Sequence, residues 1–187
     1  GLAALLNSDV SDATQVLAIF DNEETGSGTK QGAHSPVLRS ILERINYNEG
    51  ATPENFFQAV ERSFMISADN AHGLHPKYIE KQDLTNHPLL GKGPVIKYNA
   101  NQKYATDAES AAVFAGICNK ANVPFQYFVN HSDIAGGSTL GNILTAQLPL
   151  CGVDMGNAIW AMHSVRETGA VIDQSYAVRA FTTFYNL

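Results

Sequence analysis

The chain has 187 residues, of which 44% are hydrophobic and 16% charged, and its formal net charge is −6. An acidic chain without runs of Lys or Arg argues against a nucleic-acid groove, and no apolar run approaches the roughly 20 residues that span a bilayer. Two cysteines are too few for a disulfide scaffold and fit a reducing compartment. We therefore expect a cytoplasmic protein with one hydrophobic core and neither nucleic acid nor a membrane as partner.

Segments of helical and strand-like pattern alternate along the chain. Helical spacing is predicted for residues 1–7, 35–45, the first part of 54–67, 106–122, 138–148 and 174–187. Short apolar or β-branched runs predict strands at 14–20, the end of 54–67, 94–99, 125–130 and 151–156. Thr106 and Glu109 have the spacing of a capping box, and Asp173 is a candidate N-cap. The alternation predicts a layered α/β/α fold with a mixed, mostly parallel sheet.

Polar clusters follow four of the predicted strands. They comprise residues 21–24, 69–75, 131–133 and the loop around His163. Because functional sites of open α/β sheets gather beyond the carboxyl ends of the strands, we expect these clusters to form the site.

Glu23 and Glu24 are adjacent at the end of a predicted strand, where like charges repel unless a cation or a proton offsets them. One glutamate could bind a metal while the other faces a water molecule as its base. Asp69 and His163 could supply further ligands, and carboxylate with imidazole suits Zn, Co or Mn. A solvated acidic turn is the alternative interpretation of the glutamate pair.

Five motifs occur in order along nearly the whole chain: FDNEETGSGTKQGAHS, SADNAHGLHPKY, GPVIKYNANQKYATDAES, HSDIAGGSTLGN and VDMGNAIWAMHSVRE. Together they resemble the C-terminal half of the M18 family of metallo-aminopeptidases, the aspartyl aminopeptidase and aminopeptidase I type. The resemblance implies that residues 1–187 are the C-terminal portion of a zinc-exopeptidase-like catalytic domain. It also implies a homo-oligomer of twelve subunits that acts on peptides.

The family pattern implies a role for each cluster. In DNEE, the first glutamate of the family pair is the general base and the second is a metal ligand, which assigns these roles to Glu23 and Glu24. The aspartate that opens DNAH corresponds to a ligand of the other metal, Asp69, and the histidine of AMHSVRE corresponds to the ligand His163. The resemblance therefore implies hydrolysis of the N-terminal peptide bond at a site with two divalent ions, Zn first and Co or Mn as alternatives.

The motif VIKYNANQKYAT resembles the substrate-binding segment of aspartyl aminopeptidases. By this resemblance Lys97 faces the acidic side chain of the substrate's N-terminal Asp or Glu, and Tyr104 helps to hold the substrate. A lysine suits that role because a carboxylate in a partly desolvated pocket needs a cationic partner.

One departure from the family pattern concerns the ligand set. The family has two further ligands, an upstream histidine and a bridging aspartate, and both would fall before Gly1, as would the inserted dimerisation domain. We therefore expect the isolated chain to be inactive without that N-terminal segment. Two alternatives stay open: a non-catalytic fragment or assembly subunit of the same fold, and a related M42-like aminopeptidase of broader specificity.

Overall fold

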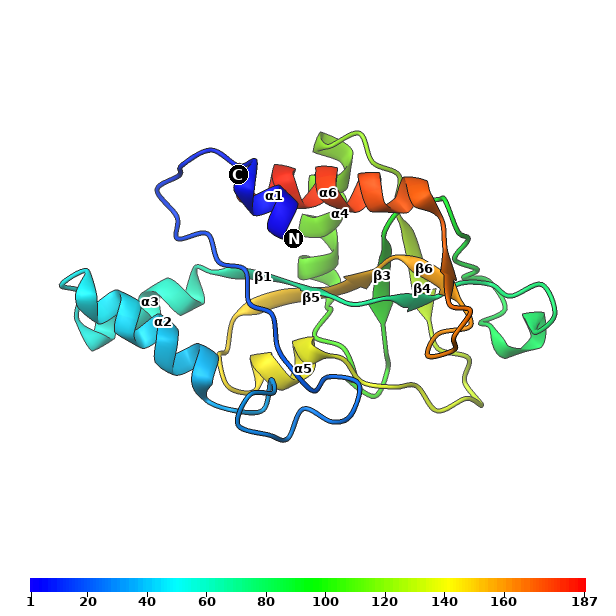
Figure 1. Cartoon of the computed structure of the whole chain (residues 1–187), viewed down its shortest axis with the longest axis horizontal. Helices are drawn as coiled ribbons and strands as arrows, with labels where there is room; N and C mark the ends of the chain where they lie inside the picture. Colours follow the sequence, from blue (N-terminus) through cyan, green and yellow to red (C-terminus); the bar gives the residue numbers. More distant parts are fainter.

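A four-stranded mixed sheet lies at the centre of the computed structural model, which describes residues 1–187 (Figure 1). Its strands, in spatial order, are β1 (Phe64–Ala68), β5 (Cys151–Gly156), β3 (Val95–Tyr98) and β4 (Gln126–Val129). The outer pairs β1–β5 and β3–β4 are parallel, whereas β3 and β5 are antiparallel. The predicted mixed, mostly parallel sheet is confirmed.

A smaller three-stranded sheet continues this one beyond the ends of β1 and β5. It contains β2 (Ala71–His72), β6 (Ala158–Trp160) and β7 (Thr168–Gly169), with β2 parallel and β7 antiparallel to β6. The first ladder ends with the amide of Asp69 donating to the carbonyl of Met155, and the second begins with Ala71 donating to Asn157. Asp69 therefore lies at the break between the two ladders.

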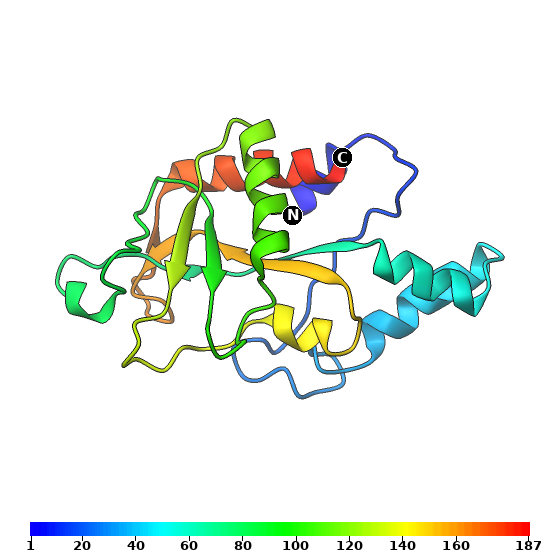
Figure 2. The same ribbon diagram turned by 180° about the vertical axis from the view of Figure 1, so that it is seen from behind.

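Helices cover both faces of the larger sheet, as Figures 1 and 2 show. On one face lie α1 (Leu2–Leu6), α4 (Ala108–Lys120) and α6 (Val171–Tyr185), and on the other lies α5 (Leu140–Thr145). The main core lies between the sheet and α4 and α6, where Phe114 and Val153 are fully buried. Burying one such side chain contributes roughly 1.5–3 kcal/mol. The layered α/β/α prediction is confirmed.

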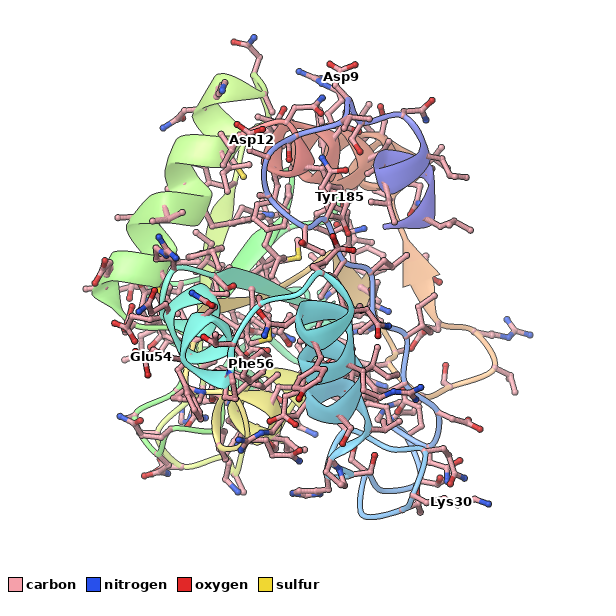
Figure 3. The ribbon with its side chains drawn as sticks, turned by 90° about the vertical axis from the view of Figure 1, so that its left-hand side faces the viewer. Asp9, Asp12, Lys30, Glu54, Phe56 and Tyr185 are labelled. Atoms are coloured by element: carbon pink, nitrogen blue, oxygen red, sulfur yellow. The ribbon has the colours of Figure 1, made fainter.

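Two further helices, α2 (Val37–Asn48) and α3 (Pro53–Glu61), project beyond the amino end of β1 (Figure 1). The α3 helix starts with Pro53 after a capping box of Thr52 and Asn55. Figure 3 shows this end of the molecule, with Glu54 and Phe56 labelled on α3. In a small apolar cluster, Phe56 of α3 packs with Leu148, so the α2–α3 pair contacts the segment that follows α5. The short helix η1 (Ile79–Lys81) lies in the loop after β2.

The predicted strand at residues 14–20 is wrong. This segment is extended but pairs with no strand, and Val16 and Ile19 are exposed. A β-branched run forms a strand only where another strand offers backbone groups to it. Side chains anchor the segment instead, because Gln15 donates to the carbonyl of Tyr185 and the Tyr185 hydroxyl donates to the carbonyl of Val16.

Two predicted helix caps are also wrong. The capping box of α4 consists of Asp107 and Ser110, one residue after the predicted Thr106 and Glu109. The N-cap of α6 is Ala170, because Asp173 is turned inward and lies inside the first turn of the helix. Its buried carboxylate accepts hydrogen bonds from the amides of Gly91 and Gly93, at 2.7 and 2.9 Å.

The start and end of the chain lie side by side. The amide of Asp9 donates to the side chain of Asn186 at 2.8 Å, and Figure 3 shows the loop that carries Asp9 and Asp12 above Tyr185 at the end of α6. None of the helices combines the length and the apolar character that crossing a membrane would require.

Candidate functional site

Glu24 and His163 meet although they come from two loops that are distant in the sequence. Glu24 Oε2 lies 2.7 Å from His163 Nε2, and both side chains are about two-thirds exposed. His163 adopts a φ of 68°, a left-handed conformation that is uncommon outside glycine, and its amide donates to the carboxylate of Glu167. Such an exposed pair contributes little to stability. The fold therefore brings together, at the surface, two side chains of the kinds that ligate metals.

Asp69 and Lys97 form the second part of the site. Lys97 lies in the middle of β3 with a side chain that is only 2% exposed, and its Nζ lies 3.5 Å from Asp69 Oδ2. The same Nζ donates to the carbonyl of Asn70 at 3.2 Å. Burial lowers the pKa of Lys97, while the negative charges of Asp69 and Asp154 act in the opposite direction. A buried ammonium thus points at the end of β1.

Tyr104 lies beside this lysine. Its ring centroid is 5.2 Å from Lys97 Nζ, within the range of a cation–π contact. Burial, followed by the charges of Asp154 and Asp69, raises the pKa of the Tyr104 hydroxyl to about 12, so this hydroxyl stays protonated and can donate a hydrogen bond. The two residues predicted to bind substrate are therefore neighbours in the structure.

Glu23 lies within electrostatic range of both parts of the site. Burial is the largest cause that raises the pKa of Glu23, followed by repulsion from Asp69 and Glu24, whereas Lys97 and His163 lower it. A raised carboxyl pKa lies closer to neutrality, where a carboxylate is a better proton acceptor. The structure thus gathers all six predicted site residues around the break between the two ladders.

The donor types of Glu24, Asp69 and His163 fit a zinc ion, but they do not form a complete shell. Glu24 and His163 are in contact, while Asp69 is engaged by Lys97. No three His, Cys, Asp or Glu side chains are grouped so that they could hold one ion, and a tetrahedral zinc site needs four ligands. The chain therefore presents one pair of candidate ligands, Glu24 and His163, and a separate candidate carboxylate, Asp69.

The four polar clusters that follow predicted strands do not all reach this site. The cluster 131–133 follows β4, which runs parallel to β3 and therefore opposite to β1 and β5. Residues 131–133 therefore lie at the opposite end of the strands from the carboxyl ends of β1 and β5. His72 does lie near the site: burial lowers its pKa, and the positive charges of Lys97 and His163 lower it further.

Sequence reasoning missed Asp154. This residue is fully buried on β5, and its Oδ1 and Oδ2 accept hydrogen bonds from Thr139 Oγ1 and the amide of Ala105. The available signal was a single charged residue inside the otherwise apolar run Val153–Gly156. A buried carboxylate requires partners, so such a residue marks a polar centre.

Comparisons with known proteins identify the family of this chain. The family model of aminopeptidase I zinc metalloprotease (M18) matches residues 1–185. A probable M18 family aminopeptidase 2 from Clostridium novyi (strain NT) is 50% identical over 186 residues, which is 100% of this chain and 43% of that protein. The chain thus spans less than half the length of this curated relative.

Solved structures give the same result. The M18 family aminopeptidase from Thermotoga maritima is similar with a TM-score of 0.86 at 27% identity, over 99% of this chain and 42% of that one. The mApe1 dodecamer of S. cerevisiae has a TM-score of 0.77 at 28% identity, over 89% of this chain and 36% of that one. The chain therefore belongs to the M18 family of aminopeptidase I zinc metalloproteases.

Proposed function

We propose that the protein that carries this chain is an aminopeptidase that removes an N-terminal Asp or Glu from peptides. The observation that carries the proposal is the buried ammonium of Lys97 beside the candidate ligand Asp69. An ammonium has three N–H donors, and Asp69 and Asn70 accept two of them. The third is available for a carboxylate on the substrate, which Tyr104 can also contact.

We assign the chemistry to Glu23, Glu24, Asp69 and His163. Glu24, Asp69 and His163 would hold zinc in a site for two divalent ions, and the rest of the relatives' length would supply the other ligands. Bound zinc supplies Lewis-acid polarisation of the scissile carbonyl and of the attacking water. Glu23 accepts the proton that this water loses as its oxygen bonds to the carbonyl carbon. Glu23 then returns the proton to the departing amine nitrogen as the C–N bond breaks.

We further propose a homo-oligomer in the cytoplasm. A relative of known structure, mApe1, is a dodecamer. Cys118 and Cys151 are unpaired, which fits a reducing compartment. The size of the assembly is read by light scattering of the purified protein.

Substrate preference tests the proposal in the protein at its full encoded length, loaded with zinc. Hydrolysis of aspartyl, glutamyl and alanyl anilides should favour the acidic substrates. Lys97→Ala should raise KM for acidic substrates roughly ten- to hundredfold, since a hydrogen bond to a charged group contributes about 1.5–3 kcal/mol. Lys103→Ala removes an exposed lysine six residues away and is the matched control. It should leave KM unchanged for both the acidic and the neutral substrates.

Each alternative function has its own outcome. An M42-like enzyme of broad specificity would lose acidic and neutral activity equally in Lys97→Ala. A non-catalytic assembly subunit would hydrolyse none of the three substrates with Zn, Co or Mn. Either result overturns the proposal.

A further inference from the structure

Asp154 is a fully buried carboxylate within electrostatic range of Lys97 and Tyr104, and no step of the proposed chemistry uses it. In the antiparallel β3–β5 ladder, Ile96 is opposite Met155. Continuing this register by one residue places Lys97 opposite Asp154. In the parallel β1–β5 ladder, Asp154 is opposite Ser67. Asp154 therefore lies between Ser67 and Lys97 in a row of residues that crosses the sheet.

Both oxygens of Asp154 are used to hold neighbouring segments. Oδ2 accepts the amide of Ala105 at 2.6 Å, and Oδ1 accepts the hydroxyl of Thr139 at 2.5 Å. The amide of Asp154 itself donates to Thr106 Oγ1 at 2.9 Å. One fully buried residue thus fastens the loop after β3 and the start of α5 to the sheet.

The anchored loop carries Tyr104. Ala105 is the next residue, so the hydrogen bond from its amide to Asp154 fixes the peptide that places the Tyr104 ring 5.2 Å from Lys97 Nζ. The backbone of α5 also packs closely on the carboxylate, because a Cβ on Gly141 would lie 2.2 Å from Asp154 Oδ2. The carboxylate therefore cannot move without displacing the loop after β3 or the start of α5.

We propose that Asp154 is a positioning residue that sets the selectivity for acidic N-terminal side chains. Through the amide of Ala105 it holds Tyr104 beside Lys97, in the arrangement that receives the substrate carboxylate, and it does not touch the substrate. The inference rests on the proposed function. Its expected signature is a higher KM for acidic substrates with nearly unchanged turnover of neutral ones, because Glu23 and the metal ligands lie on other segments.

The test compares Asp154→Ala with Asp154→Asn in the zinc-loaded protein at its full encoded length. Asp154→Ala should raise KM for aspartyl anilide at least about tenfold, which corresponds to 1.4 kcal/mol, and leave kcat for alanyl anilide within about twofold. Asp154→Asn can still accept the Ala105 amide and bond to Thr139, so it should restore part of the lost affinity. The inference is overturned if Asp154→Ala impairs hydrolysis of aspartyl and alanyl anilide equally, or if it impairs neither.

If Asp154→Ala does not fold, Thr139→Val provides a second test of the inference. It removes only the hydroxyl that holds Oδ1, and about a threefold rise in KM for the acidic substrate alone is expected. Equal effects on acidic and neutral substrates would again overturn the inference.

Hydrogen exchange separates a failure of this inference from a failure of the proposed function. The measurement uses the folded Asp154 variant that raises KM for the acidic substrate more. In this variant the amide of Ala105 should exchange at least about tenfold faster than in the wild-type protein, whether or not the protein hydrolyses peptides. Unchanged exchange overturns the anchoring role. Faster exchange with an unchanged acidic KM, in a protein that prefers acidic substrates, overturns the selectivity role. A wild-type protein without acidic preference refutes the proposed function and, with it, the selectivity role, but leaves the anchoring result standing.

Discussion

Replacing Gly156 by alanine should displace Asp69 and weaken zinc binding. Gly156 is the last residue of β5, and a Cβ there would lie 1.6 Å from the carbonyl oxygen of Asp69 and 2.7 Å from the carbonyl carbon of Asn70. Ordinary contacts of a Cβ begin at 3.4 Å, so this stretch of backbone must retreat by about 1.8 Å. Asp69 cannot retreat without stretching the hydrogen bond from its amide to Met155.

The expected cost follows from these two effects. Overpacking of a well-packed site costs about 1–3 kcal/mol and a lost backbone hydrogen bond about 1 kcal/mol, so the free energy of unfolding should fall by about 2–4 kcal/mol. Zinc affinity should fall at least about tenfold, because metal ligands must hold their distances within about 0.2 Å. Urea denaturation measures the first quantity, and calorimetric titration with zinc measures the second.

Gly116→Ala is the matched control. Gly116 lies on the exposed side of α4, and nothing lies within 4 Å of a Cβ added there. This variant should gain roughly 0.5–1 kcal/mol, because alanine favours a helix over glycine, and should bind zinc normally. Wild-type stability and zinc affinity in Gly156→Ala would refute the reasoning from backbone contact.

Two further predictions concern buried and capping carboxylates. Asp173→Ala should lower the free energy of unfolding by about 2–5 kcal/mol in urea denaturation, because the amides of Gly91 and Gly93 lose their buried, charged acceptor; wild-type stability would contradict this. The hydrogen bond from the amide of Ser110 lowers the pKa of Asp107 in the folded state below 3.8. The carboxylate therefore stabilises the fold fully above pH 3.8, and this stabilisation is lost as the pH falls through the pKa of the folded state. Asp107→Ala should therefore cost about 0.5–2 kcal/mol at pH 7, and the difference should shrink in acid unfolding curves below about pH 3.8; a pH-independent difference would contradict it.

Helices and strands that follow from the local sequence pattern were the most predictable parts of the fold. The helices predicted at 35–45 and 106–122 and the strands predicted at the end of 54–67 and at 94–99 each correspond to an observed element, within a few residues at their ends. Local propensity was insufficient for residues 14–20, where pairing decides whether an extended segment becomes a strand. The antiparallel β3–β5 contact was not predicted either, because strand order depends on contacts between distant segments.

The candidate site was predictable from motifs but not from spacing alone. Glu24 and His163 lie in different loops, and placement at strand ends suggested a shared site, whereas the family resemblance gave each residue its expected role before the fold brought them to 2.7 Å. Asp154 was missed because its importance comes from Ala105 and Thr139, which are distant in sequence and reach it only through the sheet. Polar groups whose partners are non-local leave little trace in a single sequence.

The unpaired segment 14–20 has a consequence for the dynamics of the site. Its backbone makes one hydrogen bond, from the Tyr185 hydroxyl to the carbonyl of Val16, so it can open locally at far smaller free-energy cost than the sheet. Glu23 and Glu24 follow directly on this segment, whereas Lys97 and Asp154 belong to the sheet. The proposed base and the neighbouring candidate ligand therefore lie in a less stable unit than the residues proposed to set the selectivity. Any ligand that joins Glu24 to Asp69 shifts the population of this unit toward its closed state.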